Sequence, residues 1–145
     1  MTRARLPVLL LLLLLPFPAA AGPAANVQSW LVEARGQVPQ LTTDKLKDLI
    51  DSDRDFVLVD VRLPEERREQ GRLAPFREVA IPRGYLEFRA PDKLADTDAR
   101  IIVYCGSGKR SLLAARTLQR LGYTNVSNYA GGLKAWKNAG HEVAR

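Results

Sequence analysis

Cysteine and histidine are almost absent from this chain, which has one of each among its 145 residues. A single cysteine excludes a disulfide bond within the chain, and it excludes a redox site of the Cys-x-x-Cys type, which needs two thiols. The cysteine also lies far from the apolar N-terminal stretch, so a lipoprotein anchor at that end is not expected. The one histidine, His141, lies near the C-terminus, where we expect an exposed side chain that neither binds a metal nor acts as a base.

A long apolar run and a strong charge bias are also missing. The apolar stretch at residues 6–15 is shorter than the roughly 20 residues that a membrane-spanning helix needs. The chain has 22 Lys and Arg against 16 Asp and Glu, a formal net charge of +6, with the two signs interspersed. Without an arginine-rich arm or a basic helix, the composition gives no indication of a nucleic-acid partner.

Residues 1–21 have the three-part pattern of a secretory signal peptide. Two arginines precede the apolar stretch, prolines at 16 and 18 follow it, and alanines at 19–21 form a cleavage site of the A-x-A type. Cleavage after Ala21 removes 21 of the 145 residues and leaves 124, enough for one domain with a hydrophobic core. We therefore expect a periplasmic or secreted protein with no membrane span after cleavage. The alternative is an uncleaved N-terminal anchor.

Short apolar runs alternate with helix-forming stretches over the rest of the chain. Residues 22–40 are predicted to form a small-residue linker (22–25) and a helix that Asn26 caps and Gly36 ends, and Thr42 is predicted to cap the next helix. Continuous hydrophobicity is typical of strands buried on both faces, so the alternation predicts an α/β fold: a central parallel sheet with helices on both faces. The expected strands are residues 56–59, 79–81, 101–104 and 126–129, and the expected helices are residues 27–35, 42–50, 64–69, 83–88, 112–121 and 133–138.

Cys105 opens the most distinctive segment of the sequence. It follows a predicted strand and precedes a predicted helix, so it lies at the carboxyl end of a strand, where open parallel sheets bind their ligands. Asp60 ends another buried strand at the same edge. The N–H groups of a tight loop and the helix dipole would favour a thiolate and hold an anion beside it. The loop after the cysteine consists of Gly106, Ser107, Gly108, Lys109, Arg110 and Ser111.

Five motifs, taken in order and with their spacing, resemble those of the single-domain rhodaneses, a family of sulfurtransferases. The resemblance extends from about residue 41 to residue 143, so residues 41–145 are predicted to form a rhodanese-like domain of an exported family member. The motifs are Val59-Asp60-Val61-Arg62 followed by Glu66, Ala80-Ile81-Pro82, the Cys105 loop ending in Arg110-Ser111, Leu121-Gly122-Tyr123 with Asn125-Val126, and Gly131-Gly132-Leu133-Lys134-Ala135-Trp136.

The resemblance implies covalent catalysis in two steps, without a cofactor or a metal. The Cys105 thiolate attacks the outer sulfur of a small anionic donor such as thiosulfate and releases sulfite. The enzyme then carries a persulfide, which a thiol, a protein thiol among them, or cyanide removes. The roles implied are loop curvature for Gly106 and Gly108, positive charge for Lys109 and Arg110, capping of the next helix for Ser111, and support of the sheet edge for Asp60 and Arg62. Glu66 is expected to be structural.

The chain departs from the family pattern between Arg67 and Phe76. Arg67 replaces an aromatic residue, the segment at residues 71–73 lacks the family's histidine, and residues 74–76 replace a Pro-Gly-Ala turn. These departures concern a local loop and any acceptor-binding surface there, and they leave the Cys105 loop intact. Arg67 and Arg68 are expected to form a solvated helix face.

Three other functions remain open. A cysteine phosphatase of related fold has five residues between Cys and Arg, whereas four lie between Cys105 and Arg110, and the smaller loop suits a sulfur atom better than a phosphate. A persulfide carrier or sulfur-binding module would use the same chemistry to deliver sulfur to a partner protein. A non-catalytic interaction module would leave the intact cysteine loop unexplained.

Overall fold

The computed structural model describes residues 22–73 and 78–145. The predicted signal peptide and the departure from the family pattern at residues 74–76 lie outside the described residues. Within the described ranges, no helix is long and apolar enough to cross a membrane.

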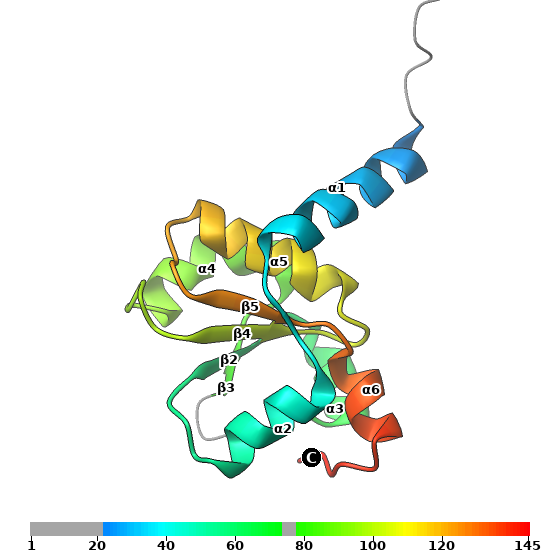
Figure 1. Ribbon diagram of the computed structural model, residues 1–145, viewed down its shortest axis with the longest axis vertical. Coiled ribbons are helices and arrows are strands. Elements are labelled where there is room, and N and C mark those ends of the chain that lie inside the picture. Colours follow the sequence, from blue (N-terminus) through cyan, green and yellow to red (C-terminus); the bar gives the residue numbers. More distant parts are fainter. Residues whose placement is uncertain (1–21, 74–77) are drawn as a thin grey trace, which may run out of the picture.

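Five strands of the described chain form one parallel sheet, which confirms the predicted fold class (Figure 1). The central strand, β4, is buried along its whole length. It pairs with β2 in a register that places Asp60 opposite Tyr104, so the ends of these two strands lie at the same edge. The strands are β1 (Gln40–Leu41), β2 (Val57–Asp60), β3 (Glu78–Ala80), β4 (Ile101–Tyr104) and β5 (Val126–Tyr129), in the order β1-β5-β4-β2-β3.

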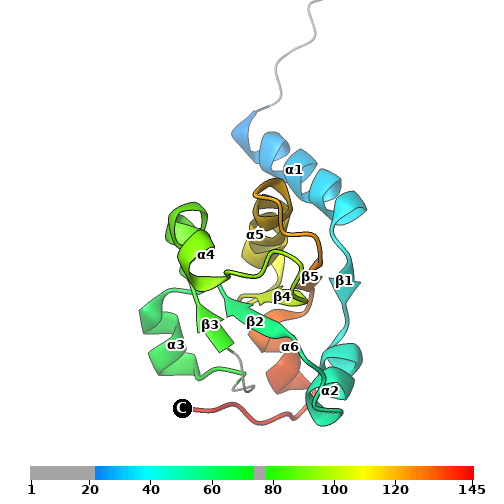
Figure 2. The same ribbon diagram turned by 90° about the vertical axis from the view of Figure 1, so that its left-hand side faces the viewer.

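Helices cover both faces of the sheet, as predicted, and each face has its own apolar core. On one face lie α1 (Pro23–Gln37), α4 (Leu86–Lys93) and α5 (Lys109–Arg120). The other face is covered by α2 (Thr43–Asp51) and α6 (Gly132–Asn138). The short helix α3 (Pro64–Gln70) lies beside β3 (Figure 2), and the 3₁₀ turn η1 (Arg83–Tyr85) leads into α4.

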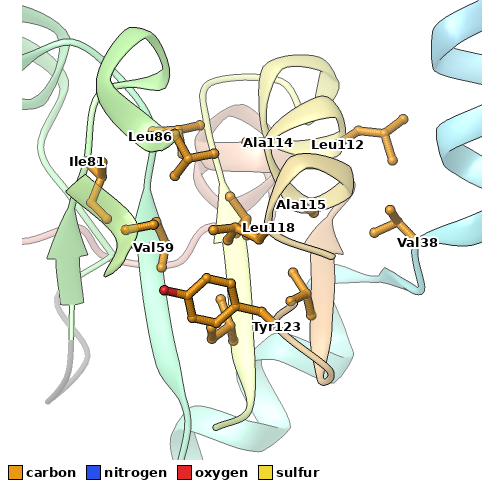
Figure 3. Close-up of a cluster of buried hydrophobic side chains, with 14 of the residues drawn as sticks. Val38, Val59, Ile81, Leu86, Leu112, Ala114, Ala115, Leu118 and Tyr123 are labelled. Atoms are coloured by element: carbon orange, nitrogen blue, oxygen red, sulfur yellow. The ribbon is translucent and has the colours of Figure 1, made fainter. Parts of the chain in front are cut away.

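The larger core fills the space between the sheet and α5 (Figure 3). Side chains of β2, of the residue after β3 and of α4 also belong to this core: Val59, Ile81, Leu86 and Ala90. Because α5 is apolar on the face toward the sheet, its position is fixed along its length, and so is the loop that precedes it. The labelled side chains are Val38, Val59, Ile81, Leu86, Leu112, Ala114, Ala115, Leu118 and Tyr123.

Three helices were predicted accurately from local sequence signals. Thr42 caps α2 as predicted, because its hydroxyl oxygen accepts a hydrogen bond from the backbone N–H of Lys45 at 3.3 Å. Helices α2, α3 and α6 each begin or end within one residue of the predicted bounds.

The prediction for α1 is wrong at both ends. There is no linker at residues 23–25, because the helix begins at Pro23, where the missing N–H of proline needs no partner. Asn26 is therefore inside the first turn rather than at the cap, and its N–H donates to the Gly22 carbonyl at 3.1 Å. Gly36 also lies within the helix, because Ala34 and Val38 on either side of it are buried in the core that α1 shares with α5. This packing outweighs the low helix propensity of glycine.

The chain after β3 also differs from the prediction. Instead of one short helix over residues 83–88, it forms η1 and then α4, which extends to Lys93. Leu86 and Ala90 anchor α4 in the core. Leu86 and Ala90 are one helical turn apart and lie on the same face, so burying both of them requires a longer helix than the local sequence indicated.

Candidate active site

Cys105 directly follows β4, and its side chain is almost completely buried, with 1% exposed. Its sulfur accepts a hydrogen bond from the backbone N–H of Gly108 at 3.2 Å. The Ser111 hydroxyl also donates to the sulfur, at 3.5 Å. The loop therefore closes over its own cysteine.

The closure depends on Gly108, which immediately precedes α5 and has a left-handed conformation with φ of 84°. A Cβ atom at this position would lie 1.9 Å from the carbonyl oxygen of Ala130, so only glycine fits. Because the chain turns at Gly108, α5 starts at Lys109, three residues before the predicted position. The prediction that Ser111 caps the helix is wrong: Ser111 lies within the first turn and directs its hydroxyl to the sulfur.

The surroundings of Cys105 favour its charged form. Burial by itself raises the pKa of the Cys105 thiol, because it removes water from the thiolate. Hydrogen bonds from the Ser111 hydroxyl and from the backbone N–H groups of Ser111, Ser107 and Gly108 act in the opposite direction and outweigh burial. The pKa of Cys105 is therefore lowered from its ordinary value, and the group is a nucleophile at lower pH than a free cysteine.

The start of α6 holds the carbonyl side of the same loop. The N–H of Leu133 donates to the carbonyl oxygen of Cys105 at 2.9 Å, and the N–H of Lys134 donates to that of Gly106 at 3.0 Å. Gly132, with φ of 59°, permits this approach, since a Cβ there would lie 2.6 Å from the Cys105 oxygen. With its carbonyls bonded to α6, the loop turns its N–H groups toward the sulfur.

Arg110 forms a two-pronged ion pair with Glu66 of α3. Its two terminal nitrogens donate to the Glu66 carboxylate at 2.7 and 2.6 Å. The hydrogen bonds to Arg110 lower the pKa of Glu66 to about 2, although partial burial opposes this shift. The contact with Glu66 raises the pKa of Arg110 in turn, and the neighbouring Cys105 contributes to this shift. The guanidinium therefore joins the loop to α3 and lies within electrostatic reach of the sulfur.

The remaining loop residues differ in exposure. Ser107 and Lys109 are exposed, while Gly106 is half-buried. Lys109 forms no ion pair with any residue of the described ranges. The site thus has one cation bound to a carboxylate and one cation free in solvent.

Asp60 and Arg62 form a fully buried ion pair at the end of β2. The Asp60 carboxylate accepts hydrogen bonds from Nε and Nη2 of Arg62 at 3.0 and 2.7 Å, and from the Arg62 backbone N–H at 3.0 Å. Arg62 also donates to the carbonyl of Gly71 at 2.9 Å. The two residues stiffen the sheet edge beside Cys105, whose sulfur is contacted by Gly108 and Ser111.

The same network includes three residues that the sequence analysis did not assign to it: Arg67, Glu78 and Tyr104. Arg67 bridges Asp60 at 2.9 Å and Glu78 at 2.6 Å, and the Tyr104 hydroxyl donates to Asp60 at 2.8 Å. The prediction of a solvated face is therefore wrong for Arg67, whose side chain is 24% exposed, and right for Arg68, which is 68% exposed. Asp60 at a strand end next to a helix beginning at Pro64 was the one sequence signal for this network, since Arg67 is one turn into that helix.

The rhodanese-like domain family matches residues 42–139 of the chain. The chain belongs to the rhodanese-like family. It is 31% identical over 103 residues to a sulfurtransferase of Allochromatium vinosum, covering 71% of this chain and 92% of that protein. It is 35% identical over 104 residues to YrkF of Bacillus subtilis, which is provisionally named a sulfur carrier protein; this match covers 72% of the chain and only 54% of YrkF.

Among solved structures, this rhodanese is similar to a protein of unknown function from Rhodopseudomonas palustris CGA009, described as a possible tyrosine phosphatase. The two are 31% identical with a TM-score of 0.74, and the match covers 89% of this chain and 98% of the other. The relatives with sulfur-transfer names support a rhodanese-type sulfur transfer for this chain.

Two further expectations concern residues outside the loop. His141 is half-buried rather than exposed, because its ring lies against that of Trp136 with centroids 4.5 Å apart. Within residues 22–73 and 78–145, no group of three or more His, Cys, Asp or Glu is arranged to hold a metal ion.

Proposed function

We propose that the protein is a sulfurtransferase that moves sulfane sulfur from an anionic donor such as thiosulfate to a thiol or cyanide through a persulfide on Cys105. The observation that carries the proposal is the Cys105 sulfur with hydrogen-bond donors on Gly108 and Ser111 at 3.2 and 3.5 Å. These donors stabilise negative charge on a sulfur that is otherwise buried in an apolar core. A persulfide anion needs the same stabilisation as the thiolate.

In the first step, the Cys105 thiolate attacks the outer sulfur of thiosulfate. A new S–S bond forms on Cys105, the S–S bond of thiosulfate breaks, and its electron pair leaves with sulfite. In the second step, an acceptor thiolate or cyanide attacks the outer persulfide sulfur and takes it away, which returns Cys105 as a thiolate. No net oxidation of the protein occurs over the cycle, so no cofactor is needed.

The two cations of the loop, Arg110 and Lys109, have different surroundings, and we infer different roles for them. Arg110 is held by Glu66, so its role is to fix the loop and to stabilise charge on the sulfur. Lys109 is exposed and free of ion pairs within the described chain, so it is the cation that attracts the dianionic donor. Loss of Lys109 should weaken use of thiosulfate, whereas loss of Arg110 should also disturb the loop.

The direct test is the intact mass of the purified protein after incubation with thiosulfate. We expect a gain of one sulfur atom, reversed by cyanide and absent from Cys105→Ser. A wild-type protein that gains no sulfur from thiosulfate or from a polysulfide would refute the proposal.

Phosphatase activity is the main rival, because a similar structure is described as a possible tyrosine phosphatase. The loop argues against it, since only four residues separate Cys105 from Arg110 and the Gly108 and Ser111 donors already approach the sulfur closely. We expect no turnover of aryl phosphates. Phosphatase turnover that is lost in Cys105→Ser, with no sulfur adduct, would reverse this assignment.

Delivery of sulfur to a partner protein is a second candidate, favoured by the similarity to YrkF. The chemistry at Cys105 is the same, and only the acceptor differs. Steady turnover with cyanide or small thiols identifies an enzyme of small acceptors. A stable persulfide that small thiols remove slowly and a protein thiol removes quickly identifies a carrier.

We further propose that the chain is exported and cleaved near Ala21, on the pattern of residues 1–21. Mass spectrometry of protein from the extracytoplasmic fraction tests this. A mass that still includes residues 1–15 would show that the N-terminus is an anchor rather than a cleaved signal.

A further inference from the structure

A groove of about 430 Å³ lies between α1, α5 and η1, on the side of α5 that faces away from the sheet. Its walls combine an indole with basic side chains. The main lining residues are Trp30, Glu33, Arg83, Leu113, Arg116 and Arg120. This groove is separate from the Cys105 loop and has no part in the mechanism above.

The first wall is the outer half of α1, whose apolar stripe continues beyond the helix that supports it. Leu31 and Ala34 are buried against the core shared with α5. Val27 and Trp30 continue the same stripe toward the N-terminus, but they are 40% and 57% exposed. The ribbon shows this end of α1 extending past α5 (Figures 1 and 2). An exposed tryptophan beside a groove is typical of a site that a partner covers.

The second wall is one stripe of α5. Leu113, Arg116 and Arg120 are spaced by three and four residues, so they lie on one helix face. Neither Arg116 nor Arg120 forms an ion pair with a residue of the described ranges. Arg83 is also in the groove, where it bonds to Glu87 and to the Thr117 hydroxyl. Among the lining residues that the structure describes, Glu33 is the one acidic side chain against three arginines, so this lining is positively charged.

We propose that this groove binds an acidic segment of a partner protein, with an apolar side chain against Trp30 and Leu113 and carboxylates on Arg116 and Arg120. The planar guanidinium matches a carboxylate with two parallel hydrogen bonds, and arginine and tryptophan carry much of the binding energy of protein interfaces. An anionic membrane fits less well, because a flat surface does not enter a concave groove that contains Glu33. A second copy of the chain fits less well because it has the same positive net charge.

The position of the groove indicates which partner uses it. The α5 stripe begins at Lys109 in the cysteine loop, four residues before Leu113, and ends at Arg120 about 16 Å away along the helix. A segment in the groove is therefore held close to the mouth of the sulfur site. On the proposed function, the partner is the protein that takes sulfur from Cys105.

Nuclear magnetic resonance of the ¹⁵N-labelled protein, purified after export with its mass determined, tests the binding. The probe is a synthetic peptide of alternating Glu and Asp with one central Leu, and the control peptide has Gln and Asn in their place. We expect a saturable shift of the Trp30 indole signal with the acidic peptide alone. The Trp136 indole is the internal control, because it is buried and donates to the Glu142 carbonyl at 2.8 Å. The affinity should fall as salt is added.

Three variants show whether the groove is the site. Arg116→Glu and Trp30→Ala should each weaken the acidic peptide by about fivefold, the effect of losing one exposed contact of about 1 kcal/mol. Lys45→Glu makes the same charge change at an exposed position of α2, on the opposite face of the sheet from the groove, and should leave the affinity unchanged. Equal weakening by Arg116→Glu and Lys45→Glu would show binding to net charge alone and overturn the proposal. Shifts confined to the Cys105 loop, binding to phosphatidylglycerol vesicles but not to the peptide, or self-association through Trp30 would also overturn it.

The link to sulfur transfer has its own readout. Acidic and amide-matched peptides with one terminal cysteine are mixed with protein already carrying a persulfide. We expect faster sulfur transfer to the acidic peptide, with the difference lost in Arg116→Glu. Equal rates would show that the groove does not select the sulfur acceptor. Absence of any persulfide would refute the proposed function, and peptide binding would still be measured independently.

Discussion

Replacing Ser111 with alanine isolates one of the hydrogen bonds that make Cys105 acidic. The Ser111 hydroxyl donates to the sulfur at 3.5 Å, and both side chains are buried. A hydrogen bond to a charged group contributes about 1.5–3 kcal/mol, and the length of this one favours the lower figure. Since about 1.4 kcal/mol is a factor of ten in an equilibrium, the thiolate population at low pH should fall roughly tenfold.

The rate of reaction should change by less than the population, because a more basic thiolate is a better nucleophile. The nucleophilicity of thiolates increases with a Brønsted coefficient of about 0.4–0.5, so a tenfold weaker acid gains about threefold in intrinsic rate. At low pH, Ser111→Ala should therefore react about threefold more slowly than the wild type. At high pH, where both thiols are ionised, it should react about threefold faster. The two pH profiles should cross.

The assay is the reaction of Cys105 with dipyridyl disulfide, followed by absorbance across a range of pH. Ser107→Ala is the matched control, because Ser107 is exposed and affects the pKa of Cys105 through its backbone N–H, which alanine retains. Its profile should superimpose on that of the wild type. Ser111→Ala curves that never cross the wild-type curve would mean that the substitution changed access to the sulfur rather than its acidity. Identical profiles for Ser111→Ala and the wild type would refute the reasoning.

Three further predictions concern stability. Arg67→Ala removes the cation that bridges Asp60 and Glu78, while Asp60 keeps its ion pair with Arg62, and it should cost about 2–3 kcal/mol in urea unfolding. Arg68→Ala, at an exposed site on the same helix, should leave the midpoint unchanged. Gly108→Ala should lower the free energy of unfolding by about 3 kcal/mol, because the new Cβ meets the backbone of Ala130. Gly140→Ala, at a similar positive φ but with no atom within 4 Å, should lower it by about 1 kcal/mol, and equal costs would contradict the proposed clash. The pKa of Glu66 is depressed to about 2, so its stabilising contribution is complete above the unfolded pKa and is lost as pH falls through about 2. Thermal melts of Glu66→Gln and the wild type should therefore differ at neutral pH and converge between about pH 4.5 and pH 2, and a gap that persists at pH 2 would show that Glu66 acts by packing instead.

Local signals predicted much of the fold. The apolar runs located four of the five strands, because strands buried on both faces lack polar positions. Thr42 and Pro64 located the starts of α2 and α3, because a cap or a first-turn proline acts on its immediate neighbours. Two-residue β1 was predicted only as a short extended stretch ending at Leu41, since two residues have no periodicity.

The errors occur where distant contacts decide. The start of α5 is set by Gly108 against Ala130, 22 residues later, and no local pattern marks that approach. Arg67 is solvated in an isolated helix and becomes part of the ion network only when β3 brings Glu78 beside β2. The sequence was enough to predict that Asp60 and Cys105 lie at one edge of the sheet, because parallel strands share a direction. It was not enough to predict the hydrogen bonds that lower the pKa of Cys105.

The attachment of the cysteine loop to α6 has a consequence for the order in which the site is completed. The carbonyls of Cys105 and Gly106 are bonded by the N–H groups of Leu133 and Lys134, which are made after the loop during synthesis and follow it through any export channel. The loop that surrounds Cys105 is therefore complete only when α6 is in place. A chain that lacks α6 should have a Cys105 of more ordinary reactivity, which the same dipyridyl disulfide assay measures.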